Sequence, residues 1–199
     1  MSFVKSAIPF SWTRTEGGCV ARLIPKTAFA DRLPMEIGGI TISAITLGQV
    51  TSVAPYSGRE DAVSAALGAL GLHFPAPGEF VVAGAARILW TGRSMALLSG
   101  APAPEGLADN AALTDQTGAL AMVELSGAGV EEALSRLIPV DLDQSAFAPG
   151  STRRTLVGHM TASVTRLEPA RFEIAVMRSM ADTLLHDLER AIGTWAARP

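Results

Sequence analysis

Apolar residues recur at helical spacing in three segments of the chain, most clearly near its C-terminal end. Between residues 180 and 195 they fall three and four positions apart, which predicts an amphipathic helix with one buried stripe. The same spacing over residues 62–70 predicts a helix that Gly71 ends, because glycine adopts the left-handed conformation that closes many helices. A third helix is expected over residues 129–138, where Pro139 stops it.

Other segments are short, and either alternate between apolar and polar positions or are rich in β-branched residues, as half-buried strands are. Gly38-Gly39 separates two of them and supplies the positive φ angles of a two-residue turn, so residues 35–42 are expected to form a β-hairpin. The stretch 100–110, rich in Gly and Pro, is a linker candidate. Further strands are expected at residues 49–55, 80–83, 87–91, 95–99, 119–125, 155–166 and 172–177.

These elements divide the chain into an N-terminal arm (residues 1–34), a first half (35–110) and a second half (111–199). Both halves run in the same order: a strand, a glycine before a helix, a Pro-Gly pair (Pro77-Gly78 or Pro149-Gly150), and then short strands. This order predicts an internal duplication in one compact α+β unit, with two antiparallel sheets that carry helices. Chance recurrence of these common elements is the alternative.

Composition narrows the classes of function that fit. Hydrophobic residues make up 48% of the 199 residues and charged residues 18%, which is more apolar than an average soluble domain. Two explanations stay open: surface buried against a partner, or many small alanines that contribute little apolar area each. The net charge of -3 provides no basic field for phosphates or anionic lipids, so neither nucleic acid nor a membrane surface is an expected partner.

The single cysteine, Cys19, has no second thiol with which to form a disulfide or a thiolate metal site. Lys5, Pro9 and Arg14 interrupt the N-terminal stretch, so it does not resemble a secretory signal. No window reaches the roughly 18 uninterrupted apolar residues that a membrane-spanning helix requires. A soluble, cytoplasmic protein is therefore expected.

Sequence motifs for catalysis are missing. His73, His159 and His186 lie far apart, and none has the i, i+3 or i, i+4 spacing to another His or to Cys that marks a metal-binding helix face. Neither a phosphate-binding glycine loop nor a nucleophile elbow is present. We therefore predict no catalytic residue and no metal ligand.

Three residues are candidates for contact with a cofactor. Asp115 either accepts hydrogen bonds from a pterin or forms a turn before the next strand. His159 is expected in mid-strand after Gly158, where the backbone can approach a ligand or partner closely; a hydrogen-bonded structural histidine is the alternative. Arg178, at a strand-to-helix junction, either holds a carboxylate in bidentate fashion or braces the junction.

Several short runs are informative through their order and spacing. They are Ala69–Pro75 with Pro77-Gly78, Arg87–Gly92, Asp115–Thr117, Leu125–Gly127, Ile138–Leu142, Phe147–Gly150, Gly158–Met160 and Phe172–Ser179. Together they resemble the gamma subunit of bacterial heterotetrameric sarcosine oxidase, over roughly residues 45–190.

The resemblance implies a non-catalytic subunit that supports assembly of the flavin-bearing subunits, with alpha, beta and delta subunits as partners. Such a complex demethylates sarcosine to glycine and yields hydrogen peroxide and 5,10-methylenetetrahydrofolate. FAD, FMN, NAD and tetrahydrofolate would belong to the whole complex, and none to this chain. The gamma subunit is similar in fold to the folate-binding domain of aminomethyltransferases, a duplicated α+β architecture.

Aminomethyltransferases carry an acidic pair in the strand that corresponds to residues 158–166, where this chain has Met160-Thr161. Without a carboxylate to steer the folate amine, one-carbon transfer by this chain alone is not expected. Two alternatives stay open, a stand-alone folate-binding module and an interaction protein that kept the fold without the oxidase. The sequence also leaves open whether the isolated chain forms a homo-oligomer.

Overall fold

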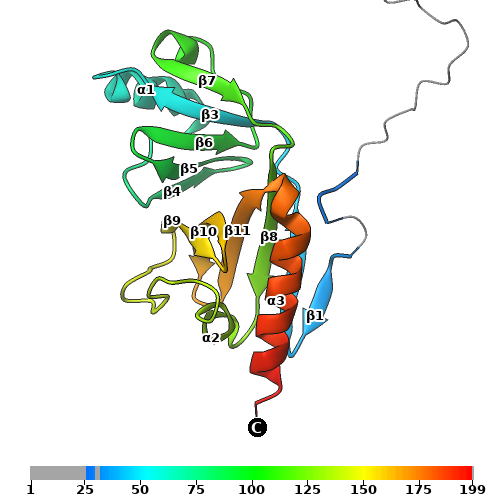
Figure 1. Cartoon of the computed structure of the whole chain (residues 1–199). Coiled ribbons are helices and arrows are strands. Elements are labelled where there is room, and N and C mark those ends of the chain that lie inside the picture. The colour runs from blue at the N-terminus through cyan, green and yellow to red at the C-terminus, as the bar shows by residue number, and fades with distance from the viewer. Residues whose placement is uncertain (1–25, 30–31, 199) are drawn as a thin grey trace, which may run out of the picture.

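The computed structural model describes residues 26–29 and 32–198, in which two antiparallel sheets form the α+β fold predicted from the sequence (Figure 1). The six-stranded sheet has the order β1 (Met35–Ile37), β2 (Ile40–Ile45), β8 (Leu120–Ser126), β11 (Arg171–Met177), β10 (Met160–Glu168), β9 (Thr152–Val157). The five-stranded sheet has the order β4 (Phe80–Ala83), β5 (Ala86–Gly92), β6 (Met95–Ser99), β3 (Val50–Pro55), β7 (Ala111–Asp115). The predicted hairpin is present as β1 and β2, with Gly38 at φ +58° and Gly39 at φ +80°.

The helices follow the predicted apolar spacing with one difference in length. They are α1 (Glu60–Leu67), α2 (Val130–Leu134) and α3 (Ala181–Ala196), with 3₁₀ turns η1 (Gly68–Leu70), η2 (Leu107–Asp109) and η3 (Arg178–Met180). The helix expected to reach residue 138 ends at Leu134, and a turn follows in which the amides of Leu137 and Ile138 both donate to the Leu134 carbonyl. Ile138 is nevertheless buried, so the apolar spacing correctly marked the core.

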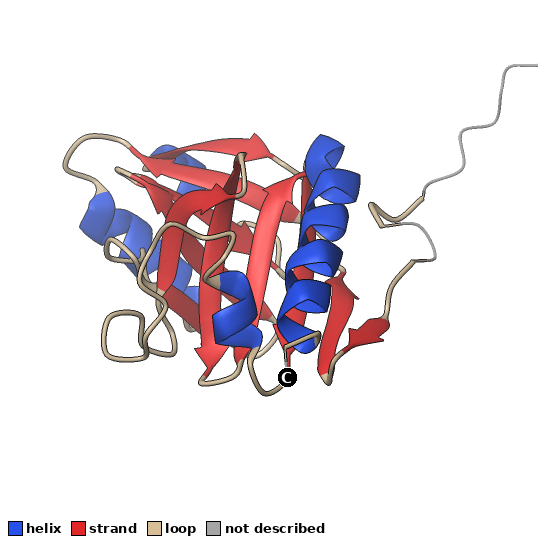
Figure 2. Cartoon of the chain, turned by 60° about the horizontal axis from the view of Figure 1, so that its bottom comes forward, coloured by secondary structure: helices blue, strands red, loops and turns tan. Residues whose placement is uncertain are grey.

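Each sheet has its own hydrophobic core on the face that its helices cover. α2 and α3 lie side by side on the six-stranded sheet (Figure 2), and the stripe of α3 buries Leu184, Leu188 and Ile192 completely. α1 packs Val63 and Leu67 against the five-stranded sheet. Burial of these apolar side chains is the main stabilising contribution of both helix layers.

Strand pairing shows that the two halves are built alike and exchange a strand. β3-α1-β4-β5-β6 and β8-α2-β9-β10-β11 have the same connections, and in each sheet the strand before the helix pairs with the last strand of its own half. The other neighbour of β3 is β7 from the second half, and the other neighbour of β8 is β2 from the first. The predicted division into residues 35–110 and 111–199 stays a prediction. Two strand pairs, β2 with β8 and β3 with β7, join one half to the other.

The two Pro-Gly turns lie against each other where the sheets meet. The amide of Phe80 donates to the Gly150 carbonyl at 3.1 Å, and the amide of Thr152 donates to the Gly78 carbonyl at 2.8 Å. An isolated antiparallel bridge joins the two residues between them, Glu79 and Ser151. The repeated Pro-Gly pairs therefore form a reciprocal contact, as expected for the two halves of a duplication.

One strand prediction was wrong and one strand was not predicted. The segment 155–166 forms two strands, β9 and β10, because Gly158 has φ +58° and turns the chain into a hairpin. β7 begins directly after the linker candidate, and its small residues Ala111 and Ala112 do not mark it as a strand. Residues 1–25 and 30–31 of the predicted arm lie outside the described residues, while Phe29 is buried in the core beside α3.

Candidate functional site

Asp115 ends β7 and forms the turn that leads to β8. Its Oδ1 accepts a hydrogen bond from the Thr117 amide at 2.8 Å, while the Thr117 hydroxyl accepts one from the Val50 amide at 3.1 Å. Hydrogen bonds from Thr117, first from its hydroxyl and then from its amide, lower the pKa of Asp115. The carboxylate thus has the turn-forming task that the sequence allowed, and contact with a pterin stays a prediction.

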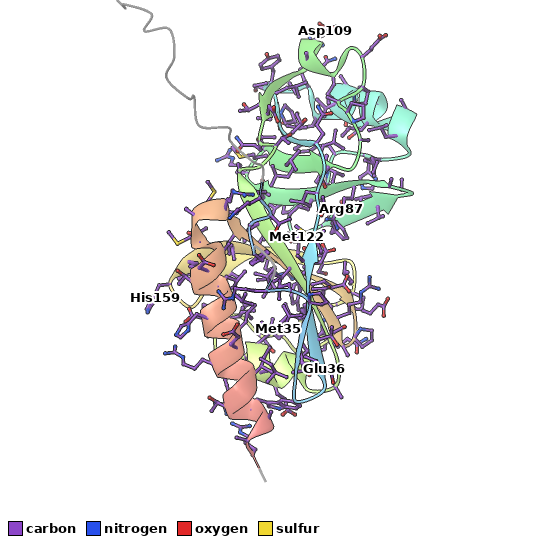
Figure 3. All side chains as sticks on the ribbon, turned by 90° about the vertical axis from the view of Figure 1, so that its right-hand side faces the viewer. Met35, Glu36, Arg87, Asp109, Met122 and His159 are labelled. Carbon is purple, nitrogen blue, oxygen red and sulfur yellow. The ribbon has the colours of Figure 1, made fainter. Side chains whose placement is uncertain are left out.

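His159 lies in the turn between β9 and β10, so the prediction of a mid-strand histidine was wrong. It is exposed, and Figure 3 shows it at the outer edge of the molecule beside α3. The close approach expected at Gly158 is made by α3: a Cβ added there would lie 2.9 Å from the Asp187 carboxylate. A contact within the chain therefore accounts for this glycine, and a role of His159 toward a ligand is untested.

Arg178 occupies the strand-to-helix junction that the sequence predicted. Its guanidinium donates to the Lys26 carbonyl, and its amide donates to the Ala119 carbonyl at 2.8 Å. It lines a hollow of about 210 Å³ together with Phe29 and Met122. Bracing of the junction is observed, whereas carboxylate binding stays a prediction; within residues 26–29 and 32–198 no hydrogen bond or ion pair joins Arg178 to Asp115 or His159.

The junction between the two sheets contains polar residues that sequence analysis missed. Arg87 of β5 donates to Glu173 of β11 at 2.8 Å, to the Ser99 hydroxyl at 3.3 Å and to the Met122 sulfur at 3.3 Å. The side chains of Arg87 and Glu173 are only 17% and 6% exposed. Figure 3 shows Arg87 and Met122 where the two sheets meet. In the sequence, Glu173 shares its strand face with Arg171, Ala175 and Met177, a mixed pattern that does not mark it as buried.

A groove of about 170 Å³ opens at one side of this junction. Met95 and Met177 line it from opposite sheets and are 45% and 51% exposed. Arg154 is the one charged side chain of its lining, and its guanidinium donates to the Ser163 hydroxyl at 3.3 Å. The full lining is Ser52, Thr91, Met95, Leu97, Gln116, Leu120, Arg154, Thr161 and Met177.

A larger hollow, of about 640 Å³, lies between α1 and the loop before β4, away from the junction of the two sheets. Its His73 ring contacts the Glu79 carboxylate at 3.0 Å, and the other oxygen of that carboxylate accepts from the Ala76 amide at 2.7 Å. The Ser64 hydroxyl accepts from the Phe74 amide at 3.1 Å. These polar groups hold the loop in place, and such pairings leave them less available for a ligand.

No cluster of three or more His, Cys, Asp or Glu side chains is placed to hold a metal ion within residues 26–29 and 32–198. No helix in that part of the chain is long and apolar enough to cross a membrane.

Comparison with known proteins supports the fold through one solved structure. The chain matches no protein-family model and no curated protein sequence. Aspartate kinase from Clostridium acetobutylicum and the regulatory subunit of aspartate kinase from Thermus thermophilus reach TM-scores of only 0.38 and 0.37 at 11% identity, covering 81% and 78% of this chain and 37% and 99% of theirs. Similarities this weak support no inference about the fold or the function of this chain.

A chain of heterotetrameric sarcosine oxidase from Corynebacterium sp. U-96, solved in complex with pyrrole 2-carboxylate, matches far better. The TM-score is 0.70 at 19% sequence identity, and the match covers 83% of this chain and 90% of that chain. The two chains therefore share a fold over nearly the whole length of the oxidase chain.

Proposed function

We propose that this chain is a structural subunit of a heterotetrameric sarcosine oxidase and corresponds to its gamma subunit. The superposition on a chain of such an oxidase, with a TM-score of 0.70 over 90% of that chain, carries the proposal. The sequence runs that resemble the gamma subunit point to the same complex independently of the coordinates. The partners are then the alpha, beta and delta subunits, in the cytoplasm.

The internal contacts of the chain support a structural role. Arg87 and Glu173 neutralise each other between the sheets, and His73 and Glu79 hold a loop. Asp115 is part of a turn and Arg178 holds the segment before β1. Each of these groups has a task in the fold, so catalysis is assigned to the partner subunits. FAD, FMN, NAD and tetrahydrofolate are bound there, and oxidative demethylation of sarcosine takes place there.

The proposal is tested by co-expressing the tagged chain with the alpha, beta and delta subunits of a heterotetrameric sarcosine oxidase from the same genome. We expect a yellow assembly that produces hydrogen peroxide when sarcosine is added, and the same subunits expressed without this chain should fail to assemble. A colourless protein that purifies alone would overturn the proposal. Tetrahydrofolate binding by that lone protein would favour a stand-alone folate-binding module instead.

A further inference from the structure

Exposed large apolar side chains gather at the groove beside the sheet junction. Met95 and Met177 line it, and Leu156, which is 43% exposed, adjoins it. Leu156 pairs with Thr161 of the groove wall and lies two positions along β9 from Arg154, so both side chains share one strand face. Three of the six exposed large apolar residues in the described part of the chain thus meet at one place.

This apolar surface continues into the junction. Leu120 lies directly across from Met177 in the strand register and is half-buried, as is Leu97 of β6. Further inside, Met122 and Leu89 are buried, although neither belongs to the helix-side core of its sheet. The groove is therefore one open end of the junction, lined there by continuous apolar side chains, and contiguous exposed apolar surface of this kind marks interaction sites.

The size and lining of the groove favour a protein partner over a small ligand. Its volume of about 170 Å³ is smaller than the roughly 300–1,000 Å³ of most ligand pockets. Methionine side chains are flexible and polarisable, so they adapt to the side chains of a docking surface. The exposed Leu156 extends the apolar area beyond the groove itself.

Charge in the groove specifies the partner further. Arg154 makes one hydrogen bond, to Ser163, and no carboxylate of the described residues lies within ion-pair distance of it. A guanidinium offers five N–H donors, most of which are thus available. The complementary group is a carboxylate, which arginine can bind with two parallel hydrogen bonds.

We propose that this groove is the docking site for an apolar segment that carries a carboxylate, contributed by another subunit of the oxidase complex. The apolar part of that segment packs on Met95, Met177 and Leu156, and its carboxylate pairs with Arg154. The proposal rests on the proposed function, because the partner is a subunit of that assembly.

The test compares variants of the tagged chain co-expressed with the alpha, beta and delta subunits of the oxidase. Met177→Glu places a charge in the apolar groove, and Arg154→Glu reverses the groove's own charge. Val82→Glu and Arg136→Glu are matched controls, because both positions are exposed and line no part of the groove. Thermal unfolding of each purified variant checks that it folds like the parent chain.

We expect both groove variants to lower recovery of the partner subunits at least about tenfold, since a misplaced charge in a docking surface costs that much affinity or more. Both controls should recover them at the parent level. A photo-reactive benzoylphenylalanine at Met95 should cross-link to one partner subunit, and the same group at Val82 should not.

The outcomes separate the two proposals. If the parent recovers its partners and the groove variants do so equally well, without a cross-link at Met95, the docking site is wrong while the subunit proposal stands. If the parent itself recovers no oxidase subunit, both proposals fail.

Discussion

Glu173 offers the sharpest test of how the two sheets are held together. Its carboxylate is 6% exposed and pairs with Arg87 across the junction at 2.8 Å, so the substitution Glu173→Gln removes the charge and preserves the shape. Two opposite charges about 4 Å apart attract by about 4 kcal/mol at the effective dielectric constant of about 20 that describes such sites. Loss of one partner from a buried pair costs about 3–5 kcal/mol, because the other charge stays buried without compensation.

Arg87 is 17% exposed and lines a hollow of about 360 Å³, through which water can partly rehydrate it. We therefore expect the lower end of that range, about 3 kcal/mol, for Glu173→Gln. In a chain of this size this corresponds to a fall of about 6–12 °C in Tm. Removing both charges with the double variant Glu173→Gln/Arg87→Met should restore part of the loss, because no uncompensated charge remains.

Urea unfolding of the purified chain, followed by tryptophan fluorescence, measures these free energies. Glu168→Gln is the control, because its ion pair with Arg171 is on the surface, where Glu168 is 62% exposed, and should change stability by less than about 1 kcal/mol. A Glu173→Gln chain no less stable than this control would refute the reasoning. It would mean that water solvates Arg87 in the junction and that the ion pair with Glu173 contributes little to stability.

Two further predictions concern the loop that follows α2. Arg166 is fully buried and pairs with Glu131, which is 38% exposed, so Glu131→Gln should destabilise the chain by about 2 kcal/mol. Arg166→Met should destabilise it less, because no buried charge is left without its partner. Equal losses of unfolding free energy in urea would contradict this. Hydrogen bonds from Ser145, chiefly its hydroxyl, lower the pKa of Asp143 in the folded chain. The Asp143 carboxylate therefore contributes to folding stability above its ordinary pKa of 3.8, and this contribution is lost as the pH falls through the lower folded-state pKa. The stability difference between the parent and Asp143→Asn should therefore shrink on acidification, and a difference independent of pH would refute that cause.

Local features of the sequence predicted most of the elements. Gly38-Gly39 correctly placed a hairpin, and the helical spacing correctly placed the buried stripe of α3. The β9–β10 hairpin was missed because Gly158 was interpreted as a site of close approach within a strand rather than as a turn. A glycine inside an apolar run allows both structures, and the sequence around His159 does not distinguish them.

The polar junction could not be predicted because it depends on contacts between distant residues. Arg87 and Glu173 are 86 residues apart and meet only once both sheets have formed. The exchange of β2 and β7 between the halves likewise depends on tertiary packing, since each strand pairs with the sheet of the other half. Alternation placed Glu173 on a strand face, but only the fold determines that a second sheet covers that face.

Native mass spectrometry of the chain co-expressed with the alpha, beta and delta subunits of the oxidase tests the subunit proposal most directly. We expect one species that contains this chain together with three different partner chains and their flavins. A spectrum in which this chain occurs only by itself, while the flavin-bearing subunits assemble completely without it, would contradict the proposal.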